Sequence, residues 1–74
     1  MSALYTDIRE KRNILRELYG GMMSMADLGR ELGMNPDDAK TWAMDRSLCV
    51  QIGKRIKVET DMVAKALVQS RGMV

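Results

Sequence analysis

The chain contains segments in which apolar residues recur with the period of a helix, and one segment in which they alternate as in a strand. The first helical segment covers residues 4–19, where apolar positions recur every three to four residues, and it stops at Gly20-Gly21. We expect the alkyl stems of Lys11 and Arg12 to cover apolar surface where the face is interrupted. The predicted apolar face consists of Leu4, Ile8, Leu15 and Leu18, with Ile14 beside it.

Residues 24–45 predict two short helices joined by one sharp turn. Ser24, followed by Asp27 three residues later, is typical of a helix start, because side-chain oxygens accept hydrogen bonds from the free amides there. Gly29 offers a patch without a side chain, where a second helix can approach closely. Gly33 is expected to end the first helix in the left-handed conformation that glycine adopts easily.

The second of these helices is expected to begin with Asn35 as its cap and Pro36 at its first position, followed by acidic Asp37 and Asp38. We expect Trp42 to make the largest single contribution to the core, so that its replacement by alanine destabilises the fold by about 3–5 kcal/mol. The residues expected to face inward are Ala39, Trp42 and Ala43.

Residues 48–58 change to a period of two, which predicts a β-hairpin with Gly53-Lys54 as its two-residue loop. A final helix is expected over residues 60–71, capped by Thr60-Asp61. The alternating apolar residues of the hairpin are Val50, Ile52, Ile56 and Val58, and the side chains expected in solvent are Gln51, Arg55 and Lys57.

The predicted fold class is mainly α with a small β-hairpin. Its order of elements is that of a winged helix-turn-helix, preceded by an extra N-terminal helix. A length of 74 residues allows one domain, here 1–74, that buries about 60% of its unfolded surface. Eight methionines and no phenylalanine predict a core of adaptable side chains.

The chain has one cysteine and no histidine, which limits the chemistry open to it. Cys49 has no partner for an internal disulfide, and its apolar neighbours predict a buried structural thiol in a reducing compartment. No Cys/His zinc site, histidine base or Cys–His pair is available, so we expect no enzyme, metal, cofactor or small-molecule substrate. The chain contains no long apolar run, so we expect neither a signal peptide nor a membrane span. The protein is therefore expected to be cytoplasmic.

The net charge of +2 is weak evidence for nucleic-acid binding, so the distribution of charge matters more. The stretch from Arg46 to Val58 contains no acidic residue. Lys54 and Arg55 at a hairpin tip suit a narrow groove of DNA, where the negative potential is strong. The four cations of this stretch are Arg46, Lys54, Arg55 and Lys57.

The segment from Met25 to Leu67 resembles the excisionase-type, MerR-like DNA-binding domains. In that family an apolar helix ends in Leu-Gly, a second helix carries an aromatic residue, and a Gly-Lys-Arg wing precedes a short helix with an acidic cap. A glycine often seen after the second helix is replaced here by Asp45-Arg46-Ser47-Leu48. The matching pieces are Leu28 to Met34, Thr41-Trp42, Val50 to Val58 and Glu59 to Asp61.

The resemblance implies binding of double-stranded DNA, with the second helix in the major groove and the wing on the adjacent groove or backbone. It also implies a role in excision of a phage or mobile element, or in transcription regulation, with a homo-oligomer or an integrase-type protein as further partner. No membrane partner is expected. The candidate DNA-binding residues are Asn35, Lys40, Thr41, Arg46, Lys54, Arg55 and Lys57.

Two alternatives stay open for the second helix and for the chain as a whole. Lys40 and Thr41 either contact DNA or belong to an ordinary solvated face. Asp37 and Asp38 are best explained as first-turn residues that match the helix dipole. The alternative function is a protein-interaction module on the same fold without DNA binding, which the weak net charge and the acidic second helix favour. The leading helix is expected either to pack on the domain or to contact a second protomer or partner.

Overall fold

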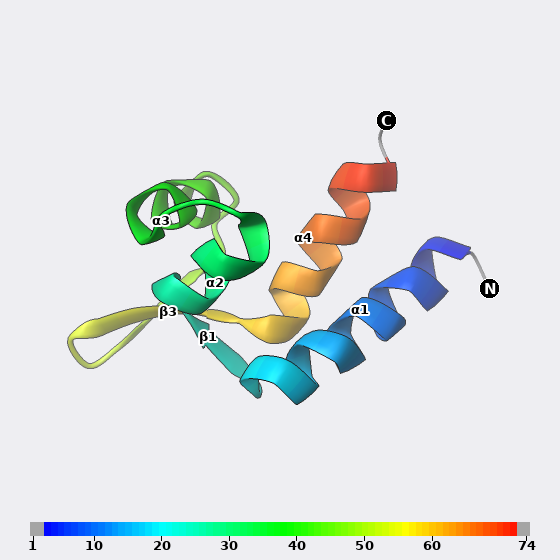
Figure 1. Cartoon of the computed structure of the whole chain (residues 1–74), viewed down its shortest axis with the longest axis horizontal. Helices are drawn as coiled ribbons and strands as arrows, with labels where there is room; N and C mark the ends of the chain where they lie inside the picture. The colour runs from blue at the N-terminus through cyan, green and yellow to red at the C-terminus, as the bar shows by residue number, and fades with distance from the viewer. Residues whose placement is uncertain (1–2, 73–74) are drawn as a thin grey trace.

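The computed structural model describes the backbone of residues 3–72 and the side chains of residues 6–70. Figure 1 shows α1 and α4 at one end of the molecule, and α3 and the β2–β3 hairpin at the other. The predicted class, mainly helical with a small β-hairpin, is confirmed. The described residues form α1 (Ala3–Tyr19), β1 (Met22–Ser24), α2 (Met25–Leu32), α3 (Pro36–Asp45), β2 (Cys49–Ile52), β3 (Arg55–Glu59) and α4 (Thr60–Gly72).

The hairpin belongs to a three-stranded antiparallel sheet in the order β1-β3-β2. β3 is therefore the central strand, and Val58 pairs with Met23 of β1 on one side and with Cys49 of β2 on the other. The sequence pattern did not predict β1, because three residues are too few to display a period. This strand leads directly into α2, so it ties the start of the helix-turn-helix to the base of the hairpin.

The start and end of α2 follow the predicted caps. The Ser24 hydroxyl accepts a hydrogen bond from the Asp27 amide at 3.0 Å, and the Asp27 carboxylate accepts one from the Ser24 amide at 3.3 Å. Gly33 ends the helix with φ +74°. A Cβ atom at Gly29 would lie 2.6 Å from the carbonyl oxygen of Met34. Gly29 therefore makes room for the backbone of the turn itself, rather than for the axis of α3.

α3 begins and ends with complete backbone caps. Asn35 accepts a hydrogen bond from the Asp38 amide through Oδ1 at 2.8 Å, and Pro36 occupies the first helical turn. At the other end, the Leu48 amide donates to the carbonyl of Ala43 at 2.9 Å, while the Ser47 amide donates to that of Met44 at 3.1 Å. This pair of bonds is a Schellman motif, which ordinarily places glycine where Ser47 stands. Ser47 has a φ of +57°.

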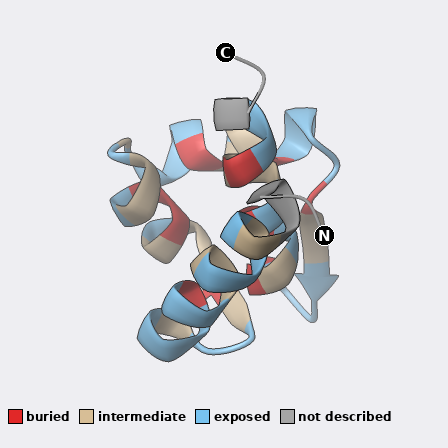
Figure 2. Ribbon diagram, turned by 90° about the vertical axis from the view of Figure 1, so that its right-hand side faces the viewer, coloured by how far each residue is buried: buried red, intermediate tan, exposed pale blue. Residues whose placement is uncertain are grey.

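The core lies where all four helices meet the sheet, and in Figure 2 the buried segments of the helices lie toward the middle of the molecule. Ala39 and Ala43 face inward, as predicted. Trp42 is half-buried and packs against this core from α3. The buried apolar residues include Leu15, Met23, Leu28, Ala39, Ala43, Leu48, Val58, Val63, Ala64 and Val68.

The inward face of α1 is centred on Leu15, which is fully buried. Ile8 is half-buried, as are Lys11 and Arg12, whose stems were expected to cover apolar surface. Leu18 is 63% exposed, so its predicted place on this face is wrong. Tyr19, one position further along, packs against the core instead. The predicted contribution of Leu4 lies outside the described side chains.

α1 is linked to α2 through one carboxylate. Glu31 accepts a hydrogen bond from the Tyr19 hydroxyl at 3.0 Å and pairs with the ammonium of Lys11 at 3.3 Å. Burial raises the pKa of the Tyr19 phenol, and the hydrogen bond to the negatively charged Glu31 raises it further. The folded chain therefore favours the protonated form of Tyr19.

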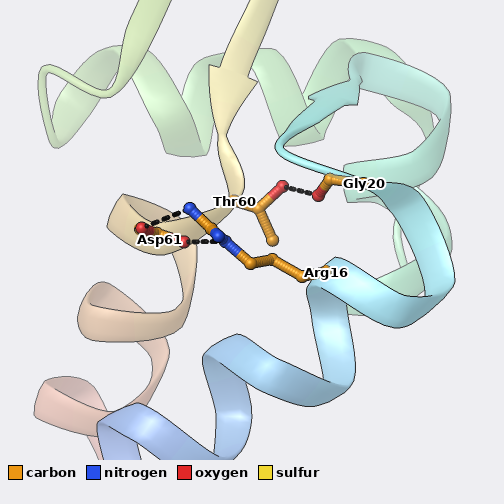
Figure 3. A network of polar contacts seen from close by, with 4 residues as sticks. All are labelled: Arg16, Gly20, Thr60 and Asp61. Carbon is orange, nitrogen blue, oxygen red and sulfur yellow. Dashed lines mark hydrogen bonds and ion pairs between the residues drawn. The ribbon is translucent and has the colours of Figure 1, made fainter.

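α1 is linked to α4 where both helices meet the turn after α1 (Figure 3). Arg16 binds the Asp61 carboxylate through two nitrogens, at 2.7 and 2.9 Å. The buried hydroxyl of Thr60 donates to the carbonyl of Gly20 at 2.7 Å, and the Thr60 amide donates to that of Gly21 at 3.0 Å. Thr60 was predicted to cap α4, but its hydroxyl joins α4 to the end of α1.

Candidate nucleic-acid interface

The tip of the β2–β3 hairpin is a two-residue turn. Ile52 pairs with Arg55 across the ladder, which leaves Gly53 and Lys54 as the loop. Gly53 has a φ of +62°, whereas the φ of Lys54 is not positive, and this combination is the pattern of a type II′ turn. The Gln51 side-chain amide donates to the carbonyl of Gly53 at 3.3 Å and braces the turn. The glycine predicted at the first loop position is thus required by the backbone.

The hairpin projects from the body of the molecule (Figure 1). Its base is anchored by buried Val58 and half-buried Cys49, whereas Lys54 and Arg55 near the tip are exposed. Lys57 lies nearer the base and is half-buried, although it was expected to project fully into solvent. Cys49 is likewise half-buried rather than buried as predicted.

The three hairpin cations are available to an external anion. Within residues 6–70, the ion pairs join Lys11 to Glu31, Arg16 to Asp61 and Arg30 to Asp27. None of them involves a hairpin residue. The charges of Lys54, Arg55 and Lys57 are therefore not neutralised by a neighbouring carboxylate in the described part of the chain.

Ile52 was not among the predicted site residues. It is 50% exposed beside the loop, although its place in the alternating pattern put it on the buried face. The hairpin extends past the core at this point, so the alternation continues where nothing covers it. The signal in the sequence was the position of Ile52 directly before the Gly53-Lys54 loop. An apolar side chain beside two cations suits contact with the sugars and walls of a DNA groove.

The outward face of α3 is acidic. Asp37, Asp38 and Asp45 are exposed on it together with Met44, which is 58% exposed. Lys40 is half-buried. Carboxylates facing phosphates are repelled, so this face is poorly suited to close contact with a DNA backbone.

The predicted polar contacts of α3 already have partners within the chain. Asn35 uses its side chain to cap the helix, and its amide nitrogen also donates to the Asp38 carboxylate at 3.2 Å. The Thr41 hydroxyl donates to the carbonyl of Asp37 at 3.2 Å, one turn earlier. Thr41 is exposed, and its hydroxyl is already paired within α3.

Arg46, unlike the three hairpin cations, is engaged in contacts within the chain. Its guanidinium stacks on the Trp42 ring at 4.2 Å from the ring centroid and donates from Nη1 to the Trp42 carbonyl at 3.1 Å. The side chain covers one face of the indole, and it lines a groove beside α4. Arg46 was predicted to flank the wing on DNA phosphates, but the structure engages it in covering Trp42.

Among the described residues, no helix is both long and apolar enough to cross a membrane. The same part of the chain contains no group of three or more acidic or cysteine side chains placed to hold a metal ion. Comparison with protein-family models, with curated proteins and with solved structures finds no match.

Proposed function

We propose that this chain is a cytoplasmic, double-stranded DNA-binding protein of the winged helix-turn-helix kind, in which the β2–β3 hairpin makes the principal contact. The observation that carries the proposal is the set of three hairpin cations, Lys54, Arg55 and Lys57, that have no carboxylate partner within the described residues. A hairpin with a two-residue loop and with Lys54 and Arg55 exposed near its tip suits a DNA groove, where phosphates from both strands lie close together.

In this proposal α3 supports the hairpin rather than dominating binding. The middle of α3 approaches the major groove with Lys40 and Thr41, while Asp37 and Asp38 stay at the helix start, where they complement its dipole. An aspartate near a base edge accepts a hydrogen bond from cytosine, which lends selectivity at the expense of affinity. Control of mobile-element excision together with an integrase-type partner, and regulation of transcription, are both roles for such a protein.

The test is titration of a fluorescent duplex at low salt, followed by anisotropy. Lys54→Ala combined with Arg55→Ala is expected to weaken binding roughly ten-fold or more, because two phosphate contacts are lost. The matched control is Arg9→Ala combined with Arg12→Ala, which removes the same charge from α1, at the end of the molecule opposite the hairpin (Figure 1). The control should bind nearly as tightly as the unchanged chain. Equal weakening by both double variants would reject the hairpin as the contact.

The exposed acidic face of α3 favours a second candidate, a protein-interaction module on the same fold. Such a module presents Asp37, Asp38 and Asp45 around exposed Met44 to a basic partner. The same titration separates the two functions, since this module would give no saturable DNA binding even at low salt.

A further inference from the structure

Two exposed surfaces outside the hairpin remain unexplained by DNA binding. The first is the α1 ridge, a line of residues that recur every three to four positions and therefore share one side of the helix. Its apolar members are Ile14, 54% exposed, and Leu18, 63% exposed. The α1 ridge consists of Asp7, Glu10, Ile14, Glu17 and Leu18, which are all exposed.

The second surface is the α4 groove, a hollow of about 380 Å³ between the end of α3 and the outer side of α4. Leu48, Met62 and Ala66 supply its apolar lining, and Met62 is 43% exposed. Arg46 and Lys65 supply two cations. None of the α1 residues whose side chains are described lines this groove. Figure 1 shows α1 on one side of α4 and α3 on the other, so the ridge and the groove belong to different sides of the molecule.

The ridge and the groove are complementary in charge. The ridge carries three carboxylates and the groove two cations, and the ion pairs among residues 6–70 use none of them. From Asp7 to Leu18 α1 rises about 17 Å, and from Met62 to Ser70 α4 rises about 12 Å, at about 1.5 Å per residue, so the groove is long enough for about two turns of the ridge. An apolar pair flanked by acids thus meets an apolar hollow flanked by bases.

We propose that the α1 ridge of one copy docks in the α4 groove of the next, so that copies of this chain associate head to tail. Such an interface is heterologous, because each copy contributes two different surfaces and keeps one of each free for further copies. The apolar contact of Ile14 and Leu18 with Met62 holds the copies together, and the charges fix the register. This association does not depend on DNA binding and is tested without DNA.

The two surfaces are small, so the association is weak. Five ridge residues and seven groove residues are fewer than the roughly 20–30 residues per side of a stable interface, so we expect a dissociation constant of about 0.1–1 mM. Sedimentation equilibrium of the full chain at low salt is expected to show an average mass that keeps rising with concentration and falls when salt is added. A monomer mass throughout this concentration range would overturn the proposal.

Two sets of substitutions distinguish a head-to-tail interface from a symmetric one. The ridge variant, Ile14→Gln with Leu18→Gln, removes the apolar pair and retains good helix formers. The groove variant, Lys65→Glu, reverses one charge. Each variant alone is expected to stay monomeric, because its association needs both surfaces. Mixed at equal concentration, they are expected to form a species of about twice the monomer mass that does not grow, because one intact ridge meets one intact groove.

Three results would contradict this arrangement. Self-association of the groove variant at wild-type strength would indicate a symmetric contact through α1 alone. A mixture that stays monomeric would show that the ridge does not bind the groove. The control Arg9→Glu reverses a charge at an exposed α1 position outside the ridge, and a loss of association in this variant would show a nonspecific charge effect. Circular dichroism confirms that each variant is folded, and Leu18→Gln alone serves as a milder ridge variant.

Discussion

Ser47 adopts a left-handed backbone conformation, φ +57°, in the Schellman motif that ends α3. A side chain crowds the backbone in this conformation, whereas glycine adopts it freely. We therefore predict that Ser47→Gly raises the free energy of unfolding by about 0.5–1 kcal/mol, after the greater flexibility of glycine in the unfolded chain is taken into account. Urea denaturation followed by circular dichroism measures the change.

The same substitution inside a helix provides the control. Ser70 is exposed on α4, and Ser70→Gly is expected to lower the free energy of unfolding by about 0.5 kcal/mol, because glycine is the weaker helix former. A decrease for Ser47→Gly as large as that for Ser70→Gly would show that the left-handed conformation is not strained.

Among individual residues, the sequence predicts the roles that depend only on near neighbours in the chain. Ser24 with Asp27, Asn35 with Pro36, and Gly33 act within three or four residues of themselves, so their roles could be predicted. Leu18 was misplaced because its burial depends on how α1 packs against the other helices. An amphipathic pattern defines a face only to within about one residue, and on α1 the face turned from Leu18 to Tyr19.

The elements are joined by a few polar contacts, of which the buried Thr60 hydroxyl is the most enclosed. It donates to the carbonyl of Gly20 at the end of α1. Thr60→Val keeps the shape and removes the hydroxyl, so this carbonyl loses its partner. We predict a loss of about 1–2 kcal/mol in the free energy of unfolding, measured by urea denaturation.

Thr41→Val is the matched control for the stability of Thr60→Val. The Thr41 hydroxyl also donates to a backbone carbonyl, that of Asp37, but on an exposed helix surface where water replaces it. Its removal should change the free energy of unfolding by less than about 0.5 kcal/mol. If the two valine variants are equally stable, the Thr60 bond does not hold α4 to α1.

The contact between α1 and α2 makes stability depend on alkaline pH. The pKa of Tyr19 is raised above 10.0 in the folded state, by burial first and by Glu31 next, so the folded chain holds the phenol proton more tightly. This contribution is fully present below pH 10 and is lost as pH rises through the folded-state pKa. Thermal unfolding across this range should show a steeper decline for the unchanged chain than for Tyr19→Phe. Parallel pH profiles would contradict the coupling.

The sequence predicts most elements but not all of the sheet. The hairpin and helices have enough residues to show a period, so they could be predicted. β1 consists of Met22–Ser24, and only its pairing with β3 makes it a strand. The link between Thr60 and Gly20 also joins residues forty positions apart, which no local pattern reveals.

For the whole molecule, the net charge of +2 conceals a separation of charge. The hairpin carries three cations without a carboxylate partner among the described residues, whereas α3 carries exposed Asp37, Asp38 and Asp45 against the single cation Lys40. The cationic loop could be predicted, because Gly53-Lys54 marks the turn and thereby puts Arg55 beside it. The contact of Arg46 with Trp42 could not be predicted, because it depends on how far the indole is exposed.

This separation predicts how DNA affinity depends on salt. Each neutralised phosphate contributes about −0.9 to the slope of log K against log salt concentration, so contacts from Lys54, Arg55 and Lys57 give a slope of about −2.7. In Lys54→Ala with Arg55→Ala the slope should shrink in magnitude by about 1.8.

Thr41→Val provides the comparison in the same salt series, because this uncharged side chain on α3 neutralises no phosphate. It should leave the slope unchanged even if it alters affinity for a particular sequence, since a contact with a base edge releases no counterion. Titrations of one duplex at several salt concentrations yield all three slopes. A double hairpin variant that keeps the slope of the unchanged chain would move the phosphate contacts away from the hairpin, and the acidic face of α3 offers no replacement for them.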